Sequence, residues 1–106
     1  MVDLALPEPA PTTFVVVLTG EIDLAREAEL DEQVQDYLAG VAVDVVIDLG
    51  SVTFMDSSGL GFVARLYREA KERGGTVTVT NPQSQVDRLM RITGVDLLVS
   101  YEPDGS

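Results

Sequence analysis

Residues 52–66 read Val-Thr-Phe-Met-Asp-Ser-Ser-Gly-Leu-Gly-Phe-Val-Ala-Arg-Leu, an apolar segment that passes through a polar joint into an amphipathic one. The joint holds the carboxylate of Asp56 and the hydroxyls of Ser57 and Ser58. Small polar side chains cap helix N-termini, where free backbone N–H groups and the helix dipole favour negative charge. The stretch therefore predicts a strand followed by a capped helix. On spacing alone, these polar residues fit a simple cap as well as a functional site.

The composition excludes several classes of function. The 106 residues include 18 acidic and 7 basic side chains, giving a net charge of −11, with no cysteine and no histidine. Such an acidic chain is not expected to bind phosphate backbones or anionic lipid. Without cysteine or histidine there is no disulfide, thiolate nucleophile, Ser-His-Asp triad or imidazole metal site. These absences argue against the common enzyme chemistries but leave carboxylate-based ones open, and we expect no metal, no cofactor, and no nucleic-acid or membrane partner.

The length and the termini indicate one domain in the cytoplasm. No apolar run approaches the ~20 residues of a membrane helix, and the first residues lack the basic segment of a signal peptide. We expect a single domain over 1–106, with an extended, proline-marked lead-in over 1–13, a core over 14–101 and a frayed tail over 102–106. Within the lead-in, Leu4–Leu6 fits a short edge strand.

The rest of the chain alternates between β-branched runs and amphipathic segments. The expected strands are 14–19, 43–49, 76–80 and 97–101. The expected helices are 24–38, the segment from the joint to Gly74, and a short helix that begins with Asn81-Pro82. Ser84 and Asp87 fit a variant of the capping box in this short helix. The nearly continuous apolar run Phe14–Thr19 is expected to be buried on both faces. This alternation predicts an α/β fold with a mostly parallel sheet of four to five strands, right-handed crossovers and three to four helices.

Two polar joints, Gly20–Asp23 and Asp56–Gly61, each follow a strand and precede a helix. In parallel sheets, sites gather at the carboxyl ends of the strands. We therefore expect both joints at the same end of the sheet, which raises Ser57 and Ser58 above simple caps.

The segment Phe54–Gly61 resembles the signature of the bacterial STAS domain, the family of anti-sigma factor antagonists. Three other elements resemble the family in the same order: Gly20-Glu21-Ile22-Asp23, Val46-Ile47-Asp48-Leu49 and Leu89-Met90-Arg91-Ile92-Thr93-Gly94. The resemblance runs from Phe14 to Tyr101. It implies a single STAS-like domain.

The resemblance also implies a function, which is regulatory and not enzymatic. Family members bind an anti-sigma factor that is a serine kinase with bound adenine nucleotide, and so release the sigma factor. The kinase then phosphorylates the serine directly before the signature glycine, here Ser58, and a serine phosphatase restores the protein. The positions expected to contact the partner are Gly20, Glu21, Asp23, Asp56, Ser57, Gly59, Leu60 and Gly61.

Some roles around the joint stay open. Gly59 and Gly61 fit two roles that do not exclude each other: they admit a partner's catalytic loop, and they allow close helix–strand packing. Phe54, Phe62, Tyr67 and the three methionines are expected in the core.

Two alternative functions also fit parts of the sequence. The chain could be a STAS scaffold of a larger signalling assembly that releases no sigma factor. It could also be an enzyme or a phospho-acceptor of another α/β type, such as a receiver domain with Asp48 as acceptor. The first strand, however, ends in Thr19-Gly20 without the acidic pair that a receiver needs.

Overall fold

The computed structural model describes residues 13–38 and 44–104. Its elements are β1 (Thr13–Ile22), α1 (Leu24–Leu38), β2 (Asp44–Met55), α2 (Ser57–Glu72), β3 (Val77–Thr80), α3 (Ser84–Thr93), the 3-10 helix η1 (Val95–Leu97) and β4 (Ser100–Glu102). The predicted edge strand Leu4–Leu6 and nearly all of the predicted lead-in lie outside the described residues.

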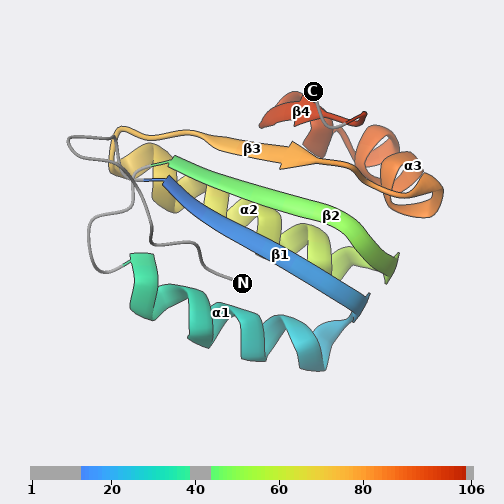
Figure 1. Cartoon of the computed structure of the whole chain (residues 1–106), viewed down its shortest axis with the longest axis horizontal. Coiled ribbons are helices and arrows are strands. Elements are labelled where there is room, and N and C mark those ends of the chain that lie inside the picture. Colours follow the sequence, from blue (N-terminus) through green and yellow to red (C-terminus); the bar gives the residue numbers. More distant parts are fainter. Residues whose placement is uncertain (1–12, 39–43, 105–106) are drawn as a thin grey trace.

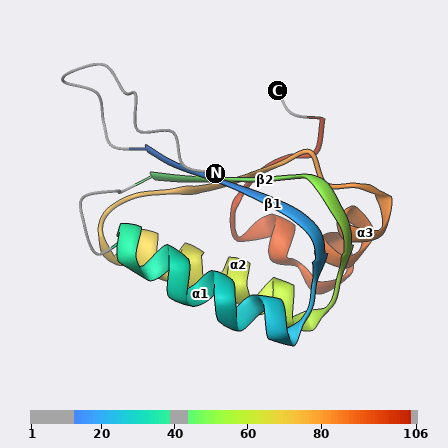
Figure 2. The same ribbon diagram turned by 60° about the horizontal axis from the view of Figure 1, so that its bottom comes forward.

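The described strands form one parallel sheet in the order β1-β2-β3-β4. The predicted α/β class is therefore confirmed. Because each strand lies beside the one before it, every right-handed crossover steps in the same direction and leaves its helix on the same face. Figures 1 and 2 show α1, α2 and α3 on one side of the sheet.

The core lies between the sheet and these helices. Along β1, Phe14, Val16 and Leu18 are buried, whereas Val15 and Val17 are only half-buried. The expectation that Phe14–Thr19 is buried on both faces is therefore wrong. No described helix covers the second face, so the strand alternates although its sequence is apolar at nearly every position.

β2 is longer than its sequence predicted. The expected strand ends at Leu49, but β2 continues to Met55 and pairs with the end of β1, where Ile22 lies opposite Met55. Two register shifts interrupt this pairing, and Gly20 beside the second one has a φ of +79°. A left-handed backbone favours glycine, so the bulge accounts for the residue at this position.

The last third differs most from the prediction. α3 begins at Ser84 after the N-cap Gln83, so Pro82 precedes the helix, and no side chain makes a cap hydrogen bond there. The Ser84–Asp87 capping box is therefore wrong. In place of the expected strand over 97–101, Gly94 turns the chain with a φ of +82° into η1, and the strand forms over Ser100–Glu102.

Candidate functional site

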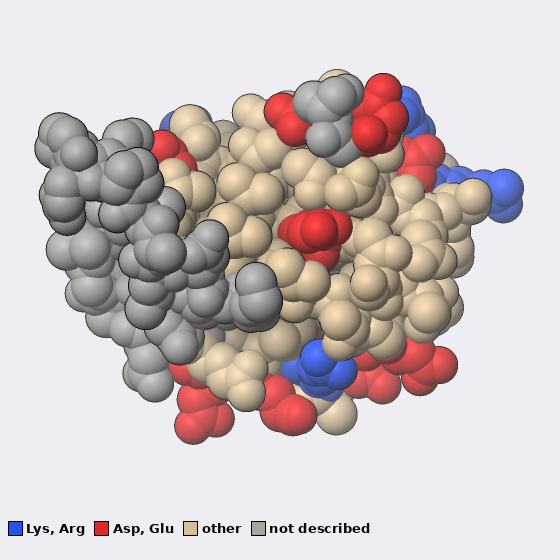
Figure 3. Space-filling model, viewed as in Figure 1, with Lys and Arg blue, Asp and Glu red and all other residues tan. Residues whose placement is uncertain are grey.

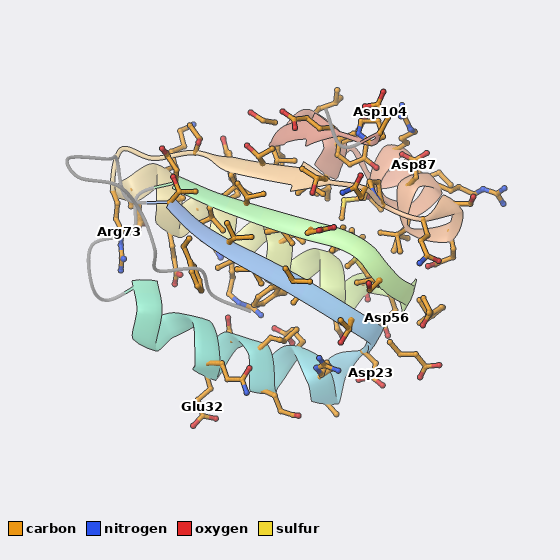
Figure 4. The ribbon with its side chains drawn as sticks, in the orientation of Figure 1. Asp23, Glu32, Asp56, Arg73, Asp87 and Asp104 are labelled. Carbon is orange, nitrogen blue, oxygen red and sulfur yellow. The ribbon has the colours of Figure 1, made fainter. Side chains whose placement is uncertain are left out.

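The two polar joints lie side by side, as predicted. β1 and β2 are parallel and end together, and the Asp56 N–H donates a hydrogen bond of 3.4 Å to the Ile22 carbonyl. Figure 4 shows Asp23 and Asp56 at this end of the sheet, which we call the carboxyl edge, with Arg73 at the opposite end. The starts of α1 and α2 therefore form one surface.

Both predicted caps are present. The Asp56 carboxylate accepts a hydrogen bond of 2.9 Å from the Ser58 N–H. The Asp23 carboxylate accepts one of 3.0 Å from the Arg26 N–H at the start of α1. Each cap satisfies one orphan N–H, and the positive ends of two helix dipoles meet at the carboxyl edge. An anion on this surface is therefore favoured by the backbone itself.

The two serines differ in exposure. Ser57 is exposed and Ser58 is half-buried, so both residues contribute to the surface. Helical spacing of seven residues places Ser58 on the same flank of α2 as Arg65, which reaches α1. Ser58 therefore lies on the side of α2 that borders the start of α1.

The two signature glycines have different surroundings. A Cβ on Gly59 would lie 2.4 Å from Cγ of Met55 and 3.1 Å from Cγ2 of Ile22. A Cβ on Gly61 would meet nothing closer than Nη1 of Arg65 at 3.9 Å. Gly59 thus serves close helix–strand packing, and Leu60 beside it is also buried. Of the two glycines, Gly61 is the one that leaves open space at the surface.

An ionic bridge joins α1 to α2 about two helical turns after Ser58. Arg65 pairs with Glu27 of α1 and, through Nε, lies 3.2 Å from an oxygen of Asp31. Burial, reinforced by the charge of Glu69, raises the pKa of Asp31. The sequence analysis missed this bridge because its partners are far apart in the chain. The bridge fixes α1 against α2, and hence Asp23 relative to Ser58.

Two exposed apolar side chains next to the caps were also missed. Leu24 is 70% exposed and Phe54 is 42% exposed, so the expectation that Phe54 belongs to the core is wrong. The signal was available, because Met55 points inward and its neighbour on a strand must point outward. Phe62, Met55 and Met90 are in the core as predicted, Tyr67 is partly buried against it, and Met1 lies outside the described residues.

The receiver alternative loses its geometric basis. Asp48 lies within β2 rather than at its end, and its carboxylate accepts a hydrogen bond of 2.9 Å from the Gly50 N–H. Within residues 13–38 and 44–104, no group of three acidic side chains is arranged to hold a metal ion. None of the helices in the described ranges has the length and apolarity needed to cross a bilayer.

Charge is unevenly spread over the molecule. Figure 3 shows a face with a largely uncharged surface, one acidic patch near its centre, and most other acidic side chains around the margin. At the carboxyl edge, Glu21, Asp23 and Asp56 supply negative charge around the apolar Leu24 and Phe54. This combination suits a partner surface with apolar pockets and cationic side chains.

Known proteins resemble this chain in both sequence and structure. A family model described as "Mlab, STAS domain" matches residues 8–100. The anti-sigma-B factor antagonist of Bacillus subtilis (strain 168) is 35% identical over 80 residues, which cover 76% of this chain and 72% of the relative. The structure of the anti-sigma factor antagonist SpoIIAA in its unphosphorylated form has a TM-score of 0.80 at 22% identity, covering 95% of this chain and 85% of that one. The phosphorylated form of the Bacillus cell fate determinant SpoIIAA has a TM-score of 0.72 at 20% identity, covering 95% and 88%.

Proposed function

Since this chain belongs to the STAS domain family and, within it, to the anti-sigma factor antagonists, we propose that it binds an anti-sigma factor that is also a serine kinase. Binding releases the sigma factor, and phosphorylation of Ser58 by the kinase ends the binding. The observation that carries this proposal is the position of Ser58. Ser58 is half-buried at a capped helix start, beside a second capped helix start and two exposed apolar residues.

The fold tolerates a phosphate at Ser58. A phosphoserine adds about −1.5 to −2 charges at neutral pH. At a helix N-terminus, the dipole and the free N–H groups stabilise such a charge by roughly 0.3–1 kcal/mol. The acidic caps Asp23 and Asp56 oppose this gain, so the net effect on folding is small.

A bound partner does not tolerate the phosphate. At about 4 Å from a partner carboxylate, each added charge is repelled by about 1 to 4 kcal/mol, depending on the effective dielectric constant. A micromolar complex has a binding free energy of only about 8 kcal/mol. Phosphorylation therefore weakens the complex strongly while the domain stays folded.

The proposed contact surface surrounds Ser58. Leu24 and Phe54 provide the apolar area, and Glu21, Asp23 and Asp56 provide the charge. Gly20, Ser57 and Gly61 are at least partly exposed and complete this surface, whereas Gly59 and Leu60 support it from inside. Buried apolar anchors within a polar rim are the usual origin of binding energy in interfaces.

The catalytic machinery belongs to the partner in this proposal. The kinase holds the adenine nucleotide, a serine phosphatase reverses the modification, and this chain contributes the acceptor hydroxyl without a cofactor of its own. The phosphorylated form of SpoIIAA supports the proposal as a state of a protein with the same fold. Because the proposed kinase uses ATP, we expect this chain to bind and release its partners in the cytoplasm.

Affinity capture from an extract of the native host tests the proposal. Immobilised wild-type protein is expected to retain a protein that binds ATP and phosphorylates Ser58, and the Ser58→Asp variant is expected to lose it. Ser84→Asp, which adds the same charge at the start of α3, is the matched control and should retain the kinase. Capture of other STAS proteins without any kinase would favour the scaffold alternative and contradict the proposal.

A further inference from the structure

Among the strands of residues 13–38 and 44–104, the end of β2 has a neighbour on only one side. β3 pairs with β2 no further than Thr80 opposite Asp48, while β2 runs on to Met55 beside β1. On the β3 side, the backbone of this last part of β2 therefore needs other hydrogen-bond partners. Side chains from the start of α3 provide them.

Gln85 takes the place of a neighbouring strand. Its side-chain oxygen accepts a hydrogen bond of 3.1 Å from the Met55 N–H, and its side-chain nitrogen donates one of 3.0 Å to the Met55 carbonyl. A primary amide thus reproduces the paired donor and acceptor of a peptide group. Gln83 makes only one such contact, donating to the Gly50 carbonyl at 2.8 Å, further from the joint.

Met55 connects this contact to Ser58. The Met55 side chain packs beneath Gly59, where an added Cβ would lie 2.4 Å from Met55 Cγ. The next residue, Asp56, caps α2 through the Ser58 N–H. The position and direction of the first turn of α2 therefore depend on where the Met55 backbone is held.

We propose that Gln85 is a positioning residue for Ser58. It holds the end of β2 so that the Ser58 hydroxyl is presented to the kinase in the geometry needed for in-line transfer. The inference rests on the proposed function, because it concerns the same acceptor hydroxyl. Phosphoryl transfer depends mainly on positioning and charge stabilisation, and a misplacement of about 1 Å can slow a reaction about a hundredfold.

The test compares Gln85→Met with Gln83→Met. Both variants keep an unbranched, helix-compatible side chain and lose side-chain hydrogen bonds to β2. The first readout is amide hydrogen exchange of the isolated protein, which reports local opening. Gln85→Met is expected to accelerate exchange at Met55 and Ser58 about tenfold, a change of the size that loss of a hydrogen-bond pair produces. Gln83→Met is expected to change exchange at Ser58 by less than about twofold.

The second readout is phosphorylation by the kinase recovered from the native host. Gln85→Met is expected to lower kcat about tenfold or more with KM changed less than about twofold, because the acceptor is misplaced while the contact surface remains. Gln83→Met should leave both values near those of the wild type. If the contact of Gln85 were merely structural, Gln85→Met would lower the melting temperature and leave kcat and KM for phosphorylation of Ser58 unchanged.

The two readouts separate the possible failures. Unchanged exchange at Ser58 in Gln85→Met, or equal effects of the two variants on kcat, would overturn the positioning role. If the wild-type protein is not phosphorylated on Ser58, the proposed function fails, and the exchange measurement alone then decides whether Gln85 positions this helix start.

Discussion

The starts of α2 and α3 are alike in their sequence and different in their surroundings. Both helices follow a strand at the carboxyl edge, and each begins with a serine, Ser57 or Ser84. The start of α2 has a side-chain cap from Asp56, a second helix start beside it, and the exposed Phe54 nearby. The start of α3 has no side-chain cap, and its glutamines bind the β2 backbone.

The difference between the two helix starts explains why Ser58, and not Ser84, is the proposed phosphorylation site. Any helix start favours an added negative charge, so the dipole alone does not distinguish Ser58 from Ser84. The distinguishing features are the exposed Leu24 and Phe54 and the second helix start near Ser58, together with the contacts that hold its turn in place. Gln83 and Gln85, at the start of α3, hydrogen-bond to the backbone of β2, the strand that leads into α2.

Placing an aspartate at each of the two helix starts should give the largest difference between them, which is a difference in affinity for the kinase. We expect Ser58→Asp to weaken binding of the kinase about a hundredfold or more, because a new charge enters the interface. Ser84→Asp should change the affinity less than about twofold. Titration calorimetry measures both affinities, and thermal unfolding should give nearly the same Tm for both variants as for the wild type. Equal weakening by the two variants would contradict the comparison.

Alanine substitution of the two signature glycines should lower stability at Gly59, which packs against β1 and β2, and not at Gly61, which borders open space. Gly59→Ala forces a methyl group against Met55 and Ile22, and overpacking of this kind lowers the free energy of unfolding by about 1–3 kcal/mol. Gly61→Ala meets only ordinary contact and gains helix propensity, so it should be neutral or stabilising by up to about 1 kcal/mol. Urea unfolding measures both changes. Equal destabilisation would show that Gly61 is also a packing residue.

Removal of the cap at α2 should have a smaller effect. Asp56→Ala leaves the Ser58 N–H without its carboxylate partner, which lowers the free energy of unfolding by about 1 kcal/mol. Ser84→Ala, at the helix start that has no side-chain cap, should stay within about 0.5 kcal/mol of the wild type. Denaturant midpoints at constant m-value provide the comparison. A larger loss in Ser84→Ala would reverse the assignment of the two helix starts.

The smallest expected effect is a pH dependence that belongs to α3. A hydrogen bond from Tyr101, at 2.6 Å, together with Arg91, holds the pKa of Asp87 below its usual value. A lowered pKa in the folded state means that this stabilisation is present above the unfolded pKa of about 3.8 and is lost as the pH falls through the folded pKa. Tyr101→Phe should therefore lose less stability than the wild type over this acid range.

Unfolding curves at pH 6 and at about pH 3 measure this difference. A Tyr101→Phe variant that loses as much stability as the wild type would show that the hydrogen bond does not set the pKa. The pH dependence of Ser58→Ala should match that of the wild type, because this variant adds no titratable group and the Asp87 cluster lies on α3 and β4.

Local patterns in the sequence predicted most of the fold. Asp23 and Asp56 are caps where the spacing placed them, α1 has the predicted bounds, and the family follows from the segment around Ser58. The parallel sheet follows from alternation of strands and helices. These features depend on residues close together in the chain, so a single sequence contains them.

The features that the sequence did not predict depend on distant partners. β2 continues without a break from Leu49 to Met55 because it pairs with β1 and because Gln85 binds the Met55 backbone, and both partners are distant in the chain. The bridge from Arg65 to α1 likewise requires the tertiary structure. Phe54 is an exception, because its exposure follows from its alternation with the neighbouring Met55, whereas hydrophobicity alone assigned it to the core.

Phosphosite mapping is the most direct measurement of the proposed switch. The wild-type protein is incubated with the captured kinase and ATP, and the modified residue is identified by mass spectrometry. We expect one phosphate per chain on Ser58, none in Ser58→Ala, and a phosphate still on Ser58 in Ser57→Ala and Ser84→Ala. A phosphate on Ser57 or Ser84 in place of Ser58, or no phosphate at all, would contradict the proposal.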